Sequence, residues 1–495
     1  MTGAVASAHP LSTRIGQSIL AEGGNAYDAT VAVSAALTVV QPHMNGLGSD
    51  FFAVVDDDGV RSINGSGWAA ADATVEVFRS KGLGSIPAFG PLSSFMVPGL
   101  VGVWSLLARR TTRPFRDLIA PAVRLARVGF PATPSIARAV AETLAHSDDD
   151  WKAIYAGLRP GVTLRQPALA RTLEAIGSDE GESFYHGAIA RQIERDMRAK
   201  GGLLRAADLE GYQAEWTSPL RVRYRGYDVY APPPNSQGAT ALIWLNLLNR
   251  DELSGVPEPA YVATLLRSME VAYRYRSRYI ADPRVVEFPK ELLAESYRYE
   301  ENDRWVPPKV PGGGDTTAFS VFDGKIGVSA IQSNYREFGS GQTVHSTGIN
   351  LNDRGSYFTL DPSHHNAVGP GRRTFHTLMA LVVLGPGRRL LLGSMGGDVQ
   401  PQVNVQVLTR LLDRGESISS AISAPRFAWP ATIYGGADLI AEEGLEISGA
   451  RLETVDRSLF GHAHAIDCRE RIEVGIDPRG DGLVPTPLDG DFRPG

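Results

Sequence analysis

Apolar residues near the start of the chain recur at helical spacing, which predicts two consecutive helices. The first carries Ile15, Ile19 and Leu20 on one side, with Ser12 or Thr13 as its cap, and Gly23-Gly24 ends it. The second can begin at Asn25 and includes the small apolar run 28–40, a composition that suits a helix buried against a sheet. A turn-rich loop over 41–50 and a strand over 51–55 follow.

The middle of the chain, 95–305, reads mainly as helix, with one strand and one rigid turn. Apolar residues fall at helical spacing around 118–125, 169–176 and 189–197. The alternation over 222–230 predicts a strand, the proline run over 231–238 a turn, and 239–248 a further helix.

A loop of three prolines and three consecutive glycines over 301–315 separates this region from the rest. Beyond it the pattern changes to strands over 317–322 and 326–331, joined by a hairpin turn at Asp323-Gly324. Helices and strands thus occur in separate runs, which indicates an α+β fold rather than a regular βαβ alternation.

Composition excludes several classes of protein. The 495 residues carry a formal net charge of −6, so a nucleic-acid or anionic-membrane partner is not expected. No segment reaches the roughly 18 apolar residues of a membrane helix, and we do not expect the first residues to act as a signal peptide, because they lack a charged start followed by an apolar run. Cys468 is the single cysteine, so no internal disulfide can form. We expect a cytoplasmic protein, and a homo-oligomer is compatible with the sequence.

Common cofactor and metal motifs find little support. Gly65-Ser66-Gly67-Trp68-Ala69-Ala70 formally fits a dinucleotide fingerprint but lacks the βαβ context, which favours a plain turn. The pairs His364-His365 and His462/His464 have no clustered carboxylates or thiols beside them. We therefore expect neither metal nor organic cofactor.

The segment Gly-Gly-Gly-Asp-Thr-Thr at 312–317 is compatible with two interpretations. It can be an ordinary glycine loop that leads into a strand. Alternatively, Thr316 attacks the Asp315 carbonyl, the chain breaks between the two residues, and the freed α-amine of Thr316 becomes the base for its own hydroxyl. An α-amine with a pKa of about 7.7–8.0 suits that role near neutral pH.

Several separated blocks, in order, give the chain a resemblance to the gamma-glutamyltransferase family of N-terminal nucleophile hydrolases. They are the segments 5–12, 23–29, 41–48, 224–236, 315–321, 338–341, 347–349, 369–373 and 393–397. The resemblance implies a four-layer αββα sandwich with a helical portion in the large subunit. It also implies self-cleavage into a large subunit, 1–315, and a small subunit, 316–495, that together form one catalytic domain.

The family roles transfer to four residues. Thr316 is implied as autoprocessing group and nucleophile, Ser333 as a second hydroxyl beside it, and the N–H groups of Gly396 and Gly397 as the oxyanion hole. Glycine suits the last role because it lets the main chain approach a developing oxyanion closely.

The departures from the family pattern concern substrate recognition. Where gamma-glutamyl transferases hold an α-amino acid, this sequence has Tyr335, Arg354 and Tyr357, and the pair His376-Thr377 replaces two serines. An acidic partner for an α-ammonium group is lost, whereas Arg354 can bind a carboxylate or a polar carbonyl. Arg354 can equally form a salt bridge, and the two tyrosines can simply pack in the core.

These observations predict an autoprocessing amidohydrolase or acylase. Its substrate is expected to be a small-molecule amide with an anionic or polar acyl group, similar to the acylase and amidohydrolase branch of the family. Two alternatives stay open: a genuine gamma-glutamyl transferase that acts on glutathione-like donors, and an unprocessed relative that binds a ligand without catalysis.

Overall fold

The computed structural model describes residues 3–299, 315–430, 438–445, 447, 450–452 and 457–481. The glycine-rich loop expected over 301–315 lies outside these ranges, apart from the backbone of Asp315 at the start of strand β9.

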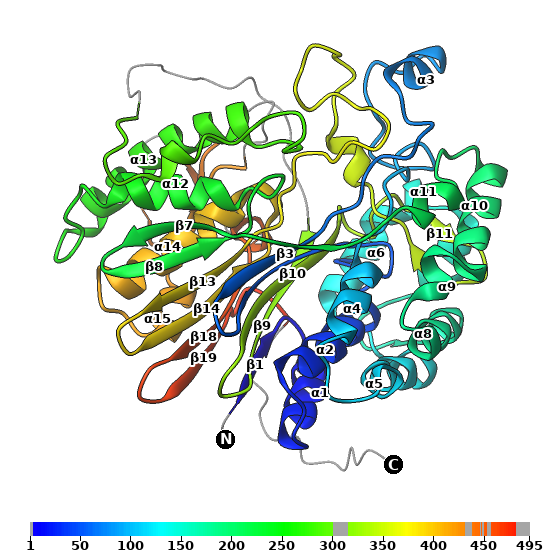
Figure 1. The fold of residues 1–495 in the computed structure, drawn as a ribbon, viewed down its shortest axis with the longest axis horizontal. Coiled ribbons are helices and arrows are strands. Elements are labelled where there is room, and N and C mark those ends of the chain that lie inside the picture. Colours follow the sequence, from blue (N-terminus) through cyan, green and yellow to red (C-terminus); the bar gives the residue numbers. More distant parts are fainter. Residues whose placement is uncertain are drawn as a thin grey trace.

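Two mainly antiparallel six-stranded sheets form the centre of the molecule (Figure 1). The first sheet has the order β1-β9-β10-β2-β3-β6, and its strands are Ala4–Ser7, Asp315–Phe322, Gly327–Tyr335, Asp50–Asp56, Val60–Gly65 and Glu215–Thr217. The second has the order β19-β18-β14-β13-β8-β7, and its strands are Ile472–Ile476, Ala463–Cys468, Arg388–Ser394, Ala380–Gly385, Tyr227–Ala231 and Leu220–Tyr224. Each sheet therefore combines strands from before and after the Asp315–Thr316 junction.

Helices cover the outer face of each sheet, so the fold is the expected α+β four-layer αββα sandwich. Figure 1 shows α1 and α2 on the side of the first sheet, and α12 and α13 on the side of the second. The first sheet carries α1 (Pro10–Ala21), α2 (Ala26–Val40) and α4 (Leu100–Ala108), with α5 (Phe115–Val128) and α8 (Pro167–Asp179) packed outside α2 or α5. The second sheet carries α12 (Gly238–Leu248), α13 (Glu258–Tyr279), α14 (Gln400–Leu412) and α15 (Ile418–Ser423).

A lobe of shorter helices extends the large-subunit part of the chain, as the resemblance implied (Figure 1). It contains α6 (Pro134–Thr143), α7 (Asp149–Tyr155), α9 (Glu182–Tyr185), α10 (Ala188–Lys200) and α11 (Ala206–Glu210), while α3 (Val75–Ser80) stands apart. The smaller strands are β4 (Phe130–Pro131), β5 (Thr163–Leu164), β11 (Thr343–Val344), β12 (Ile349–Asn350), β15 (Phe427–Ala428), β16 (Ile440–Ala441) and β17 (Arg451–Leu452).

The period of two along the strands divides the core into three apolar clusters. Phe51, Ala53 and Val55 belong to the cluster under α1, α2 and α4, whereas Phe52 and Val54 belong to the cluster between the sheets. A third cluster lies between the second sheet and α12–α14. Both faces of each sheet are therefore buried, which is the arrangement of a four-layer sandwich.

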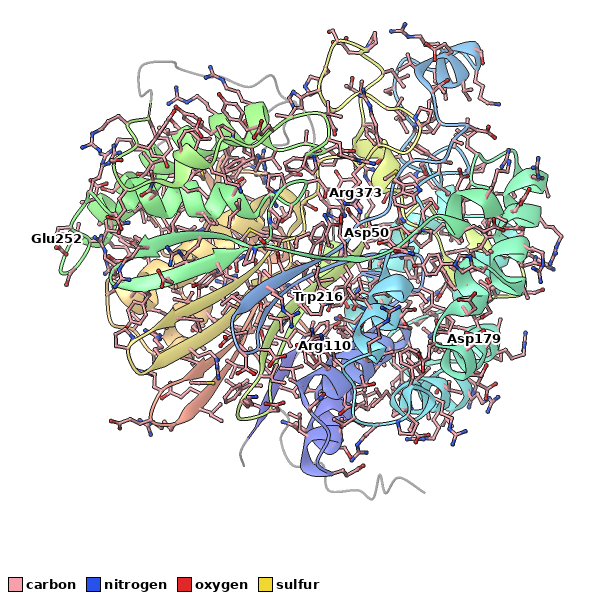
Figure 2. The ribbon with its side chains drawn as sticks, in the orientation of Figure 1. Asp50, Arg110, Asp179, Trp216, Glu252 and Arg373 are labelled. Carbon is pink, nitrogen blue, oxygen red and sulfur yellow. The ribbon has the colours of Figure 1, made fainter. Side chains whose placement is uncertain are left out.

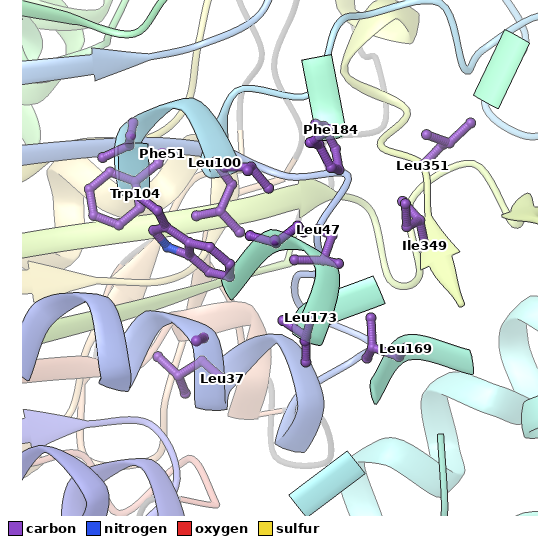
Figure 3. Close-up of a cluster of buried hydrophobic side chains, with 14 of the residues drawn as sticks. Leu37, Leu47, Phe51, Leu100, Trp104, Leu169, Leu173, Phe184, Ile349 and Leu351 are labelled. Carbon is purple, nitrogen blue, oxygen red and sulfur yellow. The ribbon is translucent and has the colours of Figure 1, made fainter. Parts of the chain in front are cut away.

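The core under the first sheet is built around large side chains from distant segments. Figure 3 shows Trp104 and Leu100 of α4 near Phe51 of β2, with Leu37 of α2 beneath them. Trp104 Nε1 donates a hydrogen bond to Ser34 on α2 at 2.8 Å, so its single polar atom is satisfied inside the core.

Three local predictions need correction. The first helix is capped by His9, whose Nδ1 accepts from Leu11 N, and not by Ser12 or Thr13, which lie inside the helix. The single strand predicted over 222–230 is a hairpin, because Arg225 and Gly226 both have positive φ and turn the chain. The second strand of the hairpin after Thr316 is longer than predicted and reaches Tyr335.

Candidate active site

Thr316, Ser333 and Asp50 lie side by side at one end of the first sheet. Along β9, Ala318 and Phe322 face the second sheet, and the period of two places Thr316 on the same face. Thr317 points the opposite way, and its hydroxyl donates to Gln41 Oε1 at 2.7 Å. Thr316 is therefore directed between the two sheets and is 2% exposed.

A β-bulge brings Ser333 opposite Thr316. Gln332 pairs with Thr317 and Tyr335 pairs with Asp315, so two residues of β10 stand against the single Thr316 of β9. The Tyr335 N–H donates to Ser333 Oγ at 2.7 Å, and Tyr335 has a φ of 81°. On its other side Ser333 pairs with Asp50 of β2. The bulge thus holds the Ser333 hydroxyl beside Thr316, in the line of neighbouring residues that runs across the strands from Thr316 through Ser333 to Asp50.

Gly396 and Gly397 form a tight turn at the amino end of a helix. Gly396 has a φ of 124°, and the short turn Gly397–Val399 continues directly into α14. The Gly396 carbonyl accepts from Val399 N at 3.0 Å, and therefore the N–H of Gly397 in the same peptide group points away from the helix. The first N–H groups of a helix have no acceptor within it, and the helix dipole adds positive potential there. This end of α14 is suited to stabilise negative charge.

Gln400 connects this turn to Thr316. Its Nε2 donates to Thr316 Oγ1 over a long 3.4 Å, and its Oε1 accepts from Met379 N at 3.1 Å. Gln400 is the first residue of α14 and is fully buried. The threonine hydroxyl therefore lies at the amino end of α14, the helix that the Gly396-Gly397 turn leads into.

Arg354 is fully buried and only partly satisfied. Its Nη1 donates to Thr377 Oγ1 at 3.1 Å, its Nε lies 3.9 Å from Asp50 Oδ2, and its guanidinium stands 4.3 Å from the centre of the Tyr335 ring. Within the described part of the chain, Nε and Nη2 have no hydrogen-bond partner. Burial lowers the pKa of Arg354 despite the nearby Asp50. A buried guanidinium with two unused donor groups is a natural site for an anionic ligand.

His376 is a neutral partner of Asp50. Its Nε2 lies 2.9 Å from Asp50 Oδ2, and its Nδ1 accepts from Leu378 N at 3.2 Å, so the proton is on Nε2. Burial, followed by the charge of Arg354, lowers the pKa of His376 to about 4. Asp50 also accepts from Gly67 N at 2.9 Å. Asp50 is fully buried and is labelled in Figure 2. It contacts His376 and Arg354 and pairs with Ser333 on the neighbouring strand.

Tyr357 and Asp398 complete the surroundings. Tyr357 lies 5.4 Å from the Tyr335 ring, and its hydroxyl donates to Asp398 Oδ1 at 2.6 Å. Arg276 of α13 is 3.2 Å from the same oxygen. Burial raises the pKa of Asp398, with Arg276 acting in the opposite direction. Asp398 Oδ2 has no hydrogen-bond partner among the described residues.

Side-chain contacts and strand pairing thus bring residues selected from sequence into one region. Thr316 touches Gln400 beside the Gly396-Gly397 turn, and Ser333 pairs with Asp50, which reaches Arg354 and His376. Thr377, Tyr335 and Tyr357 follow through the contacts described above. The Asp315 side chain lies outside the described residues.

Sequence reasoning missed five residues of this region: Asp50, Gln237, Arg276, Asp398 and Gln400. Gln237 donates to the carbonyls of both Thr377 and Gly397, at 2.6 and 2.9 Å, and so ties two parts of the site together. Only Arg276 lies far from the recognised segments in sequence. Asp50 and Gln237 stand within two residues of the segments 41–48 and 224–236, and Asp398 and Gln400 stand within three residues of Gly397, so this proximity was the available signal. Across the described residues no three His, Cys, Asp or Glu side chains are grouped to hold a metal ion.

The sequence profile of the gamma-glutamyltranspeptidase family matches residues 12–485 of the chain. The chain belongs to this family. It is a hydrolase of the N-terminal nucleophile type, as the two-sheet architecture and the relatives below also indicate. In the described ranges, every helix is too short or too polar to cross a bilayer.

Relatives of the gamma-glutamyltranspeptidase family match over almost the whole chain. A glutathione hydrolase-like YwrD proenzyme of Bacillus subtilis is 35% identical, with 97% of each chain covered. An oxamate amidohydrolase proenzyme of Klebsiella pneumoniae is 34% identical over 97% of this chain and 98% of its own. The crystal structure of a cephalosporin acylase from Bacillus halodurans has a TM-score of 0.90 and 34% identity, covering 99% of this chain and 96% of that one. Acylases, amidohydrolases and glutathione hydrolases thus all occur among these relatives.

Proposed function

We propose that this chain is an autoprocessing amidohydrolase or acylase that hydrolyses a small-molecule amide with an anionic or polar acyl group. The observation that carries the substrate class is the buried Arg354, whose Nε and Nη2 have no hydrogen-bond partner in the described part of the chain. An acyl tail with a carboxylate or a polar carbonyl would satisfy both donors and remove the cost of leaving them unpaired.

The reaction begins with cleavage of the precursor between Asp315 and Thr316. Thr316 Oγ attacks the Asp315 carbonyl carbon, the peptide C–N bond breaks, and the hydroxyl proton passes to the Thr316 nitrogen. Water then hydrolyses the resulting ester. The products are a large subunit of residues 1–315 and a small subunit of residues 316–495. The proenzyme names of the relatives support this step.

Turnover uses the freed α-amine of Thr316 as the base. Thr316 Oγ bonds the acyl carbon of the substrate, Gly396 and Gly397 N–H groups hold the oxyanion, and amine or ammonia leaves with the proton. Water hydrolyses the acyl-enzyme and restores the hydroxyl. Ser333 orients Thr316, and Tyr335, Arg354, Tyr357, His376 and Thr377 form or support the acyl pocket.

Two measurements test this proposal. The intact mass of purified protein should show two fragments for the native sequence and one uncut chain for Thr316→Ala. A glutaryl anilide should then be hydrolysed faster than the corresponding gamma-glutamyl anilide, because only the latter brings an α-ammonium group into a pocket with a buried arginine. A native chain that stays uncut would reject the mechanism.

A genuine gamma-glutamyl transferase is the second candidate, and one observation favours it. The Oδ2 atom of Asp398 has no hydrogen-bond partner among the described residues and could accept from an α-ammonium group. The same two anilides separate the candidates. Faster turnover of the gamma-glutamyl compound would assign the ammonium to Asp398 and overturn the acyl group proposed above.

A further inference from the structure

The orientation of the Gln400 carboxamide is determined by its neighbours. An amide has one acceptor oxygen and one donor nitrogen, and the backbone N–H of Met379 can bond only to the oxygen. That bond, at 3.1 Å, turns Nε2 toward Thr316 Oγ1 at 3.4 Å. The hydrogen-bond network therefore assigns the amide orientation, and Thr316 Oγ is the acceptor in this contact.

An accepting Oγ leaves its own hydrogen available. Because Nε2 has only hydrogens to offer, the Thr316 hydroxyl proton is not used in the bond to Gln400 and can be given to a base. The same N–H lies where negative charge grows on Oγ as that proton leaves. The amino end of α14, where Gln400 is the first residue, adds positive potential at the same place.

We infer that Gln400 is a further catalytic residue, which stabilises the charge on Thr316 Oγ each time the bond between Oγ and an acyl carbon forms or breaks. The inference rests on the proposed function. In acylation the Oγ proton moves to the Thr316 α-amine while Oγ bonds the acyl carbon. In deacylation water supplies hydroxide to the acyl carbon and a proton to Oγ. Gln400 keeps its own protons in both steps.

The contact should shorten when charge develops. Hydrogen bonds to an ionised oxygen are shorter and stronger than neutral ones, and catalytic bonds are often long before the substrate binds. A separation of 3.4 Å in the resting chain therefore fits a group that acts mainly in the transition state. The gain appears in kcat rather than in KM.

Gln400 also satisfies the Met379 N–H, so its catalytic role must be separated from a structural one. Gln400→Glu makes that separation, since its carboxylate can still accept from Met379 N but has no hydrogen to donate to Thr316 when ionised. Gln400→Met removes both contacts at similar side-chain length. Gln406 is the matched control, because it is a buried glutamine of the same helix that bonds to the carbonyls of Gln402 and Phe427, away from Thr316.

The experiment measures precursor cleavage by intact mass, and turnover of the two anilides at several pH values, for the native chain, Gln400→Glu, Gln400→Met and Gln406→Met. For Gln400→Glu we expect a kcat about 100-fold lower, the scale of one lost donor to a developing negative charge, with KM within about twofold. Its melting temperature is measured as well, because a carboxylate at this buried position costs stability. The kcat of this variant relative to that of the native chain at the same pH should recover partly at low pH, where the introduced carboxyl group is protonated and can donate. Gln406→Met should cleave and turn over like the native chain.

The outcomes separate this inference from the proposed function. If the native chain cleaves and Gln400→Glu matches it in both cleavage rate and kcat, Gln400 is structural and only the inference fails. If the native chain cleaves but hydrolyses neither anilide, the inference is tested by precursor cleavage alone. Equal cleavage rates for Gln400→Glu and the native chain would then overturn it. If the native chain does not cleave, the proposed function fails and the inference fails with it.

Discussion

Asp398 and Arg276 form an ion pair in which the side chains are 1% and 0% exposed, with Oδ1 and Nη1 3.2 Å apart. Asp398 directly follows the Gly396-Gly397 turn, whereas Arg276 comes from α13, more than a hundred residues earlier in the chain. The Asp398 carbonyl also accepts from Tyr273 Oη on α13 at 2.8 Å. The ion pair therefore anchors the candidate oxyanion turn to a helix that precedes the Asp315–Thr316 junction in sequence.

Breaking this pair should destabilise the protein strongly. Arg276→Met leaves the Asp398 carboxylate buried without its cation, which typically costs about 3–5 kcal/mol. Chemical denaturation of the Thr316→Ala precursor measures the loss without interference from cleavage. The double variant Arg276→Met/Asp398→Asn should lose clearly less than the sum of the two single variants. Additive losses would show that the two charges do not act as a pair.

Arg354 should determine the acyl preference. Arg354→Met removes the two unused donors, and each hydrogen bond to a charged group contributes about 1.5–3 kcal/mol, so kcat/KM for a glutaryl anilide should fall by about 100-fold or more. An uncharged acetyl anilide should be affected much less. Arg336→Met is the control: Arg336 also lies over Tyr335, at 4.9 Å, but its charge is paired with Asp353 at 2.7 Å. An equal loss for both anilides in Arg354→Met would contradict the assignment.

The Gly396 conformation should matter for catalysis and not only for stability. A Cβ added there would lie 2.7 Å from Val399 Cγ2, at a φ of 124°. Gly396→Ala should therefore displace the turn and lower kcat by about 100-fold or more, the effect of a lost oxyanion donor. Gly415 is the control, because it has a φ of 66° and open space around an added Cβ. Gly415→Ala should cost about 1 kcal/mol of stability and leave kcat unchanged. Steady-state kinetics and thermal melts of both variants test this.

Acid should destabilise the fold through buried histidines. Burial lowers the pKa of His464 to about 4, and within the described residues both of its ring nitrogens are without a hydrogen-bond partner. The unfolded chain takes up a proton near pH 6.5 while the folded chain does not. The contribution of neutral His464 to the free energy of unfolding is therefore complete above about pH 6.5 and is lost as the pH falls toward 4. The loss is on the order of 3 kcal/mol.

His464→Leu should flatten this part of the pH dependence. The measurement is the free energy of unfolding from urea titrations between about pH 4 and pH 8, in the Thr316→Ala background. His464→Leu should lose less stability than its parent between pH 6.5 and 4. Parallel curves for the two proteins would mean that His464 is not the titrating group.

The sequence by itself determined most of the helices and strands, and it singled out Thr316 as the candidate nucleophile. The strand segments 51–55 and 317–322, and the helical spacing near Ile15 and Leu173, are local properties that survive in the fold. Local rules failed where a neighbour intervened. His9 rather than Ser12 caps α1, and Arg225 and Gly226 turn an apparent strand into a hairpin.

Only the tertiary structure decided how the site is assembled. Four residues of the site belong to no recognised motif: Asp50, Gln237, Arg276 and Gln400. They reach the site because strands and helices remote in sequence end at the same edge of the sandwich. The side chain of Arg354 was open to several interpretations from sequence. Its full burial, with Nε and Nη2 lacking a hydrogen-bond partner among the described residues, gives it the character of a ligand site, because a donor group without a partner costs more inside a protein than in water.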